Sequence, residues 1–393
     1  MHVRRRFEGN VAMNGVPAAI PRVLATLMVA ATLALGGCAS TEEWSRTTGY
    51  PPMTAAEGRA LVARLMPDGV ADRSGWATDI YAAFAALDIP PTPENLCATI
   101  AITEQESGFR ADPAVPGLSR IAWKEIDARR ERAGVPKLVL DAALALPSSN
   151  GKSYSERLDA VKTERQLSEI YEDFIDLVPL GKKFLADSNP VRTGGPMQVG
   201  IAFAQAHAAA KPYPYSVSGS SRHEVFTRRG GLYFGIAHLL DYPAPYDRHL
   251  YRFADFNAGR YASRNAAFQS AVTQVSGVPL TLDGDLLRYE QTQVARDPGS
   301  TELATRVLAQ RLGLSNDDIR RDLEQGKDAA FGQTRLYQRV YALADGASAQ
   351  PAPRAVVPNI LLQSPKITRK LTTDWFAQRV ESRHQTCLGR YRS

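Results

Sequence analysis

Apolar positions along the chain recur mainly with the period of an α-helix. Within residues 73–87, Trp76, Ile80 and Phe84 fall on one stripe, the pattern of a helix with one buried face. Strand signals are few, and the best is a hairpin at 278–289 centred on Asp283-Gly284. The pattern therefore predicts a mainly α fold with a small β-hairpin. Comparable helical patterns cover residues 54–66, 92–108, 119–133, 164–176, 199–210, 224–240, 262–275, 302–312, 317–325 and 372–387.

The first forty residues have the layout of a bacterial export signal. Three arginines at 4–6 precede an apolar run of 13 residues at 23–35, and Gly36-Gly37 leads directly to Cys38. The run is too short to span a bilayer, which needs about 20 apolar residues. These features are typical of a lipoprotein signal peptide and predict cleavage after residue 37 and lipid on Cys38. The alternative is a short helix buried in the fold.

Removal of residues 1–37 changes the charge of the chain. It takes away four arginines and one glutamate, so the formal net charge falls from +6 to +3. No basic run interleaved with aromatics remains, so we expect no nucleic-acid partner, although weak attraction to acidic envelope polymers is compatible with this charge. Ala39 stands where an aspartate is associated with retention in the inner membrane. This favours a lipid anchor in the outer membrane, and the leaflet is not specified by the sequence.

Two cysteines, Cys97 and Cys387, remain once Cys38 is acylated. In a compartment that oxidises thiols, they predict a disulfide that ties the last helix to the start of the core. Two separately buried thiols are the alternative.

Breaks in the pattern divide the chain into segments. Residues 38–53, rich in Ser, Thr and Glu and ending near Pro51-Pro52, predict a lipidated tether. Residues 54–345 predict one helical domain with enough apolar residues for a substantial interior. A second polar break follows, so we expect residues 346–393 to form a linker and a C-terminal helix packed on the core.

A glutamate near the end of one predicted helix is the first candidate for catalysis. Glu106 lies between the apolar residues Ile102 and Phe109. Poor solvation and the partial negative charge of a helix C-terminus both raise a carboxyl pKa, so such a group can donate a proton to a glycosidic oxygen. The alternative is an ordinary solvated surface glutamate.

Three further motifs follow Glu106-Ser107 along the chain. They are Gly195-Pro196-Met197-Gln198, Gly230-Gly231-Leu232-Tyr233 and Phe256-Asn257-Ala258-Gly259. In this order the four resemble the Glu-Ser, Gly-Leu-Met-Gln, Gly-x-x-Tyr and Tyr-Asn-Ala-Gly motifs of the lysozyme-fold lytic transglycosylases. The resemblance implies a lysozyme-like helical core.

The same resemblance implies roles for individual residues. Glu106 would act first as acid and then as base. One carboxylate suffices, with no cofactor, where the N-acetyl group of the sugar replaces the second carboxylate. The sugar C6 hydroxyl then replaces water and gives a 1,6-anhydro product, and peptidoglycan supplies both groups. The residues implied to contact the glycan or to support Glu106 are Ser107, Met197, Gln198, Tyr233 and Asn257.

The chain departs from that family in two places. Phe256 stands where the family has a tyrosine whose hydroxyl can bond the catalytic carboxyl. Ser107 and Gly194 lie 87 positions apart, which predicts a long insertion at about 110–190. The insertion is open to three interpretations: a lid, a substrate platform or a partner surface.

Over nearly the whole length after the signal, the chain also resembles the YaiW-like outer-membrane lipoproteins. The segments that carry this likeness are 112–118, 189–198, 251–268 and 364–369. The resemblance implies a location at the outer membrane and leaves the mechanism open.

Other side chains offer weaker chemistry. The five histidines after the signal lack His-Glu-x-x-His spacing, so we expect no metal site, and His238 is interpreted as a core residue. The run Arg228-Arg229-Gly230-Gly231 is either a glycan contact or a close helix approach over glycines. Asp112 or Asp255 within about 10 Å of Glu106 would suit a two-carboxylate hydrolase.

Three functions follow from these observations. The first is an enzyme that cleaves peptidoglycan with Glu106, which requires Glu106, Gln198 and Asn257 to line one groove. The second is a lipoprotein that keeps the cleft to bind glycan or peptide without cleaving it. The third is an accessory of envelope assembly or uptake whose insertion is a partner surface, and the sequence names no protein partner.

Overall fold

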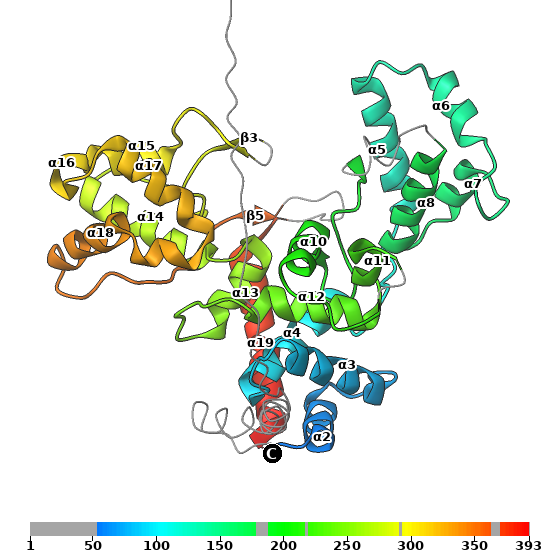
Figure 1. Cartoon of the computed structure of the whole chain (residues 1–393), viewed down its shortest axis with the longest axis horizontal. Helices are drawn as coiled ribbons and strands as arrows, with labels where there is room; N and C mark the ends of the chain where they lie inside the picture. Colours follow the sequence, from blue (N-terminus) through cyan, green and yellow to red (C-terminus); the bar gives the residue numbers. More distant parts are fainter. Residues whose placement is uncertain (1–52, 178–187, 217–218, 291–292, 363–369, 393) are drawn as a thin grey trace, which may run out of the picture. The chain divides into compact units, whose positions relative to one another are not determined.

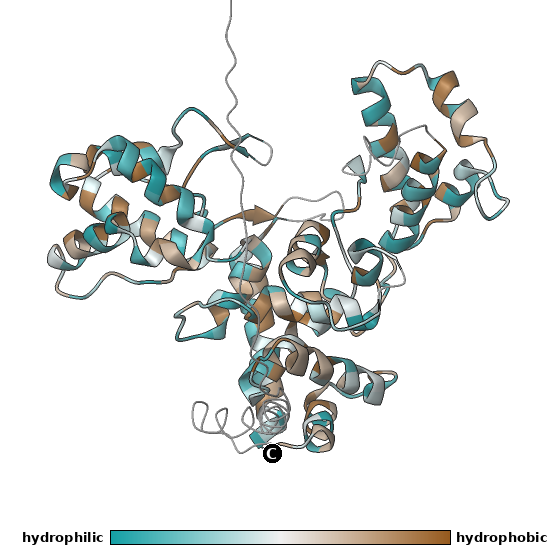
Figure 2. Cartoon of the chain, viewed as in Figure 1, coloured by the Kyte–Doolittle hydropathy of each residue, from teal (hydrophilic) through white to brown (hydrophobic). Residues whose placement is uncertain are grey.

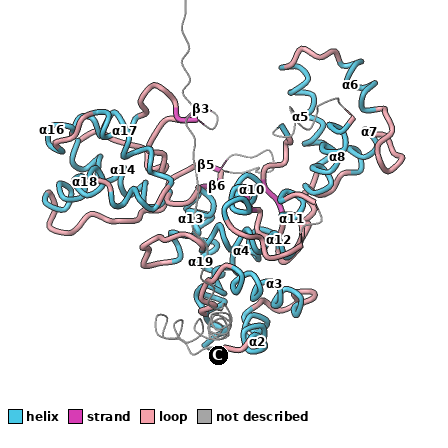
Figure 3. The backbone as a smooth tube through the Cα atoms, in the orientation of Figure 1, coloured by secondary structure: helices cyan, strands magenta, loops and turns pink. Residues whose placement is uncertain are grey.

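The computed structural model describes residues 53–177, 188–216, 219–290, 293–362 and 370–392 (Figure 1). The predicted signal, Cys38 and the tether up to residue 52 lie outside these residues, as does the segment 364–369. The described part is mainly α, as predicted (Figure 3). None of its helices is both long enough and apolar enough to cross a bilayer. Its strands are antiparallel pairs: β1 (Thr193–Gly194) with β2 (Val199–Gly200), β3 (Tyr289–Glu290) with β4 (Gln293–Val294), and β5 (Leu361–Leu362) with β6 (Leu371–Thr372).

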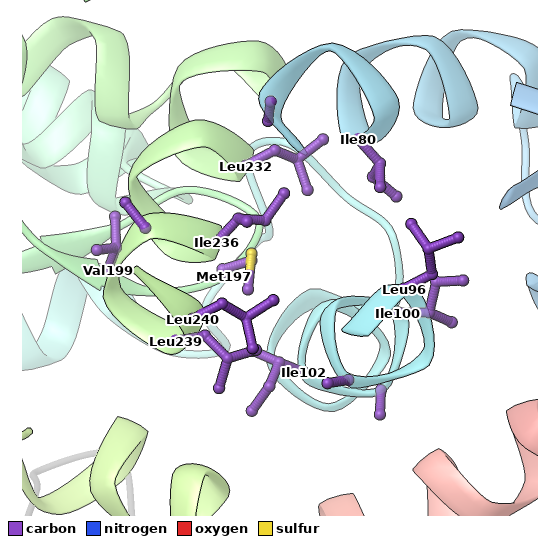
Figure 4. Packing of buried hydrophobic residues seen from close by; sticks show 14 of the residues in the cluster. Ile80, Leu96, Ile100, Ile102, Met197, Val199, Leu232, Ile236, Leu239 and Leu240 are labelled. Atoms are coloured by element: carbon purple, nitrogen blue, oxygen red, sulfur yellow. The ribbon is translucent and has the colours of Figure 1, made fainter. Parts of the chain in front are cut away.

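The largest buried apolar cluster, here called the α4 core, gathers helices from both ends of the sequence. Figure 4 shows Met197 and apolar side chains of α12 directed toward Ile80, Leu96 and Ile100. α19 packs against both α4 and α13 in this core. The helices are α2 (Ala55–Leu65), α3 (Arg73–Ala86), α4 (Pro93–Ser107), α10 (Ile201–Ala210), α11 (Ser221–Val225), α12 (Arg228–Leu240), α13 (His249–Ala258) and α19 (Thr373–Arg392).

Local sequence sets the limits of α4. The Thr92 hydroxyl accepts a hydrogen bond from the Asn95 amide, and Pro93 occupies the first helical position. The helix ends at Gly108, whose φ of 57° is left-handed. Cys97, in the first half of α4, is bonded to Cys387 of α19, so the predicted disulfide is present and joins the two helices.

Two further buried clusters have helices of their own. The α14 core contains α14 to α18, and the insertion core contains α5 to α8. In the insertion core, Tyr154 is fully buried against Phe174, with the ring centroids 5.2 Å apart. The helices are α14 (Ala262–Ser276), α15 (Ser300–Val307), α16 (Ala309–Leu312), α17 (Asn316–Glu324), α18 (Arg335–Gly346), α5 (Leu118–Arg132), α6 (Lys137–Leu144), α7 (Tyr154–Ala160) and α8 (Glu164–Asp176).

The predicted hairpin at 278–289 is wrong. This stretch is irregular apart from Tyr289, and side-chain amides of α14 satisfy its polar groups in place of a strand partner. Gln269 accepts a hydrogen bond from the Gly284 amide and donates one to the Asp283 carboxylate. Asn265 donates to the Gly284 carbonyl. The Asp-Gly turn signal is therefore part of a loop held against a helix.

Candidate functional site

α12 packs against the elements that carry or adjoin the other three motifs. It carries the Gly-Gly-Leu-Tyr motif and packs against α4, which bears Glu106, against β2, which follows Gln198, and against α13, which bears Asn257. α4 and α13 are in turn both covered by α19. Elements that are far apart in the sequence and carry the motifs are therefore neighbours of one buried helix.

Glycines allow the Gly-Pro-Met-Gln turn to lie directly on α12. A Cβ added at Gly231 would lie 2.3 Å from the Pro196 ring, and one at Gly235 would lie 2.5 Å from the Met197 sulfur. Both distances are shorter than a van der Waals contact, so only glycine fits. Of the two interpretations of the Arg-Arg-Gly-Gly run, the close helix approach is the one observed.

Gln198 ends this turn in a left-handed conformation, with a φ of 51°. Its backbone amide donates a hydrogen bond to the Gly195 carbonyl at 3.1 Å, and its side-chain oxygen accepts one from the Thr193 hydroxyl at 3.2 Å. The side chain is half-buried. The hairpin thus fixes Gln198 while leaving part of its side chain exposed.

Glu106 is half-buried at the end of α4, where the chain turns sharply. The neighbouring Ser107 donates a hydrogen bond to the Thr103 carbonyl at 3.0 Å and accepts one from the Arg110 amide at 3.3 Å. Gly108 is left-handed, and Phe109 has a φ of 59°. The Ser107 hydroxyl is therefore engaged in holding the turn that follows Glu106.

Three strained backbone positions lie in or close to these motifs. Phe109 directly follows the Glu-Ser-Gly turn, Gln198 ends the second motif, and Tyr261 lies two residues beyond Gly259 of the fourth. Positive φ in such residues costs about 1–3 kcal/mol each and persists where the surroundings enforce it, often at functional sites. In the described residues, the non-glycine positions with positive φ are Asp72, Asp88, Phe109, Gln198 and Tyr261.

Phe109 shows how the surroundings enforce one of these conformations. Its side chain is buried and meets Trp76 of α3 edge to face, with the ring centroids 5.3 Å apart. The turn after Glu106 is thus anchored in the α4 core.

Asn257 is exposed at the end of α13 and accepts a hydrogen bond from the Thr373 hydroxyl at 3.1 Å. The preceding Phe256 packs on His238, with the rings 5.1 Å apart. Burial lowers the pKa of His238 to about 4, and its ring also meets Phe203, so the half-buried ring packs among aromatic side chains.

Asp255 is a structural carboxylate. It is fully buried and accepts hydrogen bonds from the Tyr242 and Tyr246 hydroxyls and from the amides of Tyr261 and Ser263, at 2.6–3.1 Å. Burial raises its pKa above the usual range. These bonds hold the start of α14 and stabilise the left-handed Tyr261. The carboxylate has no exposed surface for a second catalytic role.

Asp112, the other carboxylate considered, belongs to the base of the insertion. It accepts a hydrogen bond from the Thr163 hydroxyl at 3.0 Å and pairs with Arg165 at 3.2 Å. At the other end of the insertion, Arg222 of α11 donates to the Val191 carbonyl at 2.9 Å and pairs with Glu172 of α8. The insertion leaves and re-enters the core next to the first two motifs.

Met197 and Tyr233 are both buried, with exposed fractions of 0% and 1%. Met197 packs against Gly235, and the Tyr233 hydroxyl lies 3.3 Å from His207. The structure gives both side chains a packing role, while their predicted contact with a glycan stays a prediction.

A pocket of about 500 Å³ lies at the opposite end of α4 from Glu106. Asn95 lines it, and the rise of an α-helix puts Asn95 about 16 Å from Glu106 along the helix axis. This pocket is therefore separate from the residues of the candidate site.

Thr373 and Arg222 were not predicted as residues of the site. Thr373 begins the last helix, and nothing in its neighbourhood marks it as a partner of a motif 116 positions earlier. Arg222 pairs with Glu172 of α8, and no local pattern marks a partner so distant in the sequence. Within the described part of the chain, no three His, Cys, Asp or Glu side chains are grouped to hold a metal.

Comparison with known proteins gives a family and one relative. The family described as "Protein of unknown function (DUF1615)" matches residues 69–390. The chain is 52% identical over 365 residues to "Uncharacterized protein YaiW" of Escherichia coli (strain K12), covering 93% of this chain and 98% of that protein. No solved structure matches.

Proposed function

The chain belongs to the DUF1615 family, and we propose that this member is an exported lipoprotein that cleaves peptidoglycan glycan strands with Glu106 as its acid. The observation that carries the proposal is the strained backbone inside one of the four motifs, at Gln198, and within two residues of two others, at Phe109 and Tyr261. Strain of this kind is retained where it positions functional groups. The packing of the motif-bearing elements on α12 supports it further.

The proposed reaction needs one carboxyl group. Glu106 protonates the glycosidic oxygen, the bond from that oxygen to the sugar C1 breaks, and the N-acetyl oxygen of the same sugar bonds C1. The C6 hydroxyl then attacks C1 and releases the N-acetyl group, while Glu106 takes the hydroxyl proton. The product is a 1,6-anhydro sugar, and Glu106 is protonated again. Gln198 and Asn257, which keep exposed surface, would bind the glycan.

A digest of purified sacculi tests this reaction. We expect the wild-type chain to release 1,6-anhydro muropeptides and Glu106→Gln to release none. Glu104→Gln is the matched control, because Glu104 lies on the same helix and pairs with Arg383 at 3.3 Å, outside the proposed chemistry. Absence of anhydro products from the wild-type chain contradicts the proposal.

A non-catalytic glycan-binding lipoprotein is the second candidate, and Phe256 favours it. The ring packs on His238 and carries no hydroxyl to bond a catalytic carboxyl. The sacculus digest separates the two functions. If the wild-type chain sediments with sacculi and releases no product, and if Asn257→Ala is no longer retained on sacculi, the chain is a binding protein.

The proposed anchor is tested separately. Cells that express the chain and receive labelled palmitate should incorporate the label, and Cys38→Ser should abolish both the labelling and recovery in the outer-membrane fraction. Labelling that survives Cys38→Ser contradicts the assignment of Cys38.

A further inference from the structure

The pocket at the start of α4 has an apolar wall and the size of a small-molecule site. Its volume is about 500 Å³, and such sites commonly have about 300–1,000 Å³. Leu87, Ile89 and Leu240 line it, and all three belong to the α4 core. Figure 2 shows the hydrophobic colouring of this core along α12, the helix that ends at Leu240. A ligand in the pocket would therefore lie against side chains that folding has already fixed.

Three polar side chains that line the pocket are already engaged. Lys211, just after α10, pairs with Asp241 at 2.6 Å, so these two charges neutralise each other. The Asn95 amide nitrogen donates a hydrogen bond to the Pro90 carbonyl at 3.0 Å, and its oxygen lies 3.2 Å from Nε2 of His249. These groups form a fixed polar border.

Arg252 of α13 brings a positive charge that no carboxylate neutralises. Among the described residues, this half-buried side chain bonds to carbonyl groups only. Its guanidinium donates to the carbonyls of Leu239, Tyr242 and Ala244 at 3.3–3.4 Å, which is long for such bonds. It also lies over the Tyr242 ring, 4.7 Å from the centroid. These contacts hold the cation in place, and a carboxylate would be a stronger acceptor for it.

Asp88 brings the opposite charge to the same pocket. This exposed residue follows α3 and has a left-handed φ of 54°, a conformation that aspartate tolerates better than most residues. Within the described part of the chain, its carboxylate pairs with no cation, Arg252 included. Two opposite charges therefore line one pocket without neutralising each other.

This arrangement selects for a ligand that carries both charges. An anion alone would meet Asp88, and a cation alone would meet Arg252, whereas a zwitterion satisfies both. The apolar wall favours an apolar segment between the two charges. A single amino acid carries both charges on one carbon, while two extended residues span about 7 Å and can bridge groups that do not touch.

We propose that the pocket binds short apolar peptides as zwitterions. The ligand carboxylate pairs with Arg252, its ammonium group pairs with Asp88, and its side chains pack on the wall formed by Leu87, Ile89 and Leu240. The site lies apart from Glu106 and requires no cleavage, so the inference stands independently of the proposed function.

Isothermal titration calorimetry of the purified full chain with the dipeptide alanylleucine tests the binding. Two derivatives each remove one charge from the ligand. N-acetylalanylleucine lacks the ammonium group, and alanylleucine amide lacks the carboxylate. We expect each derivative to bind the wild-type chain at least about tenfold more weakly, because it loses a hydrogen bond between charged groups.

Variants of the chain assign each charge to its partner. Arg252→Gln should bind the dipeptide and its amide equally, and Asp88→Asn should bind the dipeptide and its acetyl derivative equally. The matched controls are Arg248→Gln and Asp68→Asn, at exposed positions outside the pocket, and both should bind as the wild-type chain does. Urea unfolding checks that Arg252→Gln is folded. If it is not, the two derivatives still test the proposal on the wild-type chain.

Four results would overturn the proposal. They are no saturable binding of the dipeptide at millimolar concentration, full affinity of both derivatives for the wild-type chain, equal losses in the control variants, and binding of free leucine as tight as that of the dipeptide. The last result would assign the pocket to single amino acids. Because calorimetry of a dipeptide reads neither sacculus cleavage nor palmitate, its outcome is independent of the proposed function.

Discussion

The Thr373 hydroxyl donates a hydrogen bond to the side-chain oxygen of Asn257 across 3.1 Å, joining residues 116 positions apart. Thr373 is fully buried and is the first residue of α19, whereas Asn257 is exposed. The orientation of the Asn-Ala-Gly motif therefore depends on the C-terminal helix.

Thr373→Val should free the Asn257 side chain while keeping the shape of the residue. We expect retention on sacculi, or cleavage if the chain is an enzyme, to fall about fivefold, because one hydrogen bond contributes about 1 kcal/mol. Thr373→Ser keeps the hydroxyl and should retain most of the function. Equal loss in both variants would mean that the bond to Asn257 plays no part.

Gly231→Ala should destabilise the chain by about 1–3 kcal/mol, because the added Cβ collides with Pro196 and with the Val225 carbonyl. Urea unfolding measures the change. Gly389→Ala is the control, since this exposed helical glycine has open space around it and alanine should stabilise by up to about 1 kcal/mol. Two equal effects would rule out the close approach as the cause.

Loss of the Cys97–Cys387 disulfide should cost about 2–5 kcal/mol, because the bond closes a loop across 290 positions. Differential scanning calorimetry should show that a reductant lowers the Tm of the wild-type chain. The same reductant should leave Cys97→Ala with Cys387→Ala unchanged. Two reactive thiols in the unfolded, unreduced wild-type chain would contradict the bond.

Acid should destabilise the chain through His249. Burial, with repulsion from His384 and Arg252, lowers its pKa to about 4, against about 6.5 when unfolded. The unfolded chain therefore takes up the proton first, and the free energy of unfolding falls by up to about 3 kcal/mol as the pH drops from about 6.5 to about 4. Above that window the stabilisation is complete.

Urea unfolding at pH 7 and pH 4.5 measures this dependence. His249→Gln should weaken it, while His223→Gln, at an exposed position on α11, should behave as the wild-type chain. A pH dependence that is unchanged in His249→Gln would contradict the assignment.

Most of the helices were predicted from local signals in the sequence. Thr92-Pro93 starts α4 and Glu164 starts α8 where predicted, because caps act over a few residues. The predicted helix at 224–240 is divided, since Thr227 caps α12 and α11 ends at Val225. α6, α7, α13 and α18 were not predicted as helices.

The candidate site was predictable only as a set of motifs. Glu106, Gln198 and Asn257 could be named because each stands in a short pattern. The burial of Met197 and Tyr233, and the bond from Thr373 to Asn257, arise from contacts between distant segments. Such contacts leave no periodic signal in one sequence. The separate α14 core was missed for the same reason.

Synthesis from the N-terminus has a consequence for α19. All four motifs are made before this helix exists, and α4 and α13 lack their covering helix until then. The hydrogen bond to Asn257 and the disulfide to Cys97 can form only after α19 has been made, because Thr373 and Cys387 both belong to this helix. The α4 core therefore reaches its final geometry only after the whole of α19 has been made.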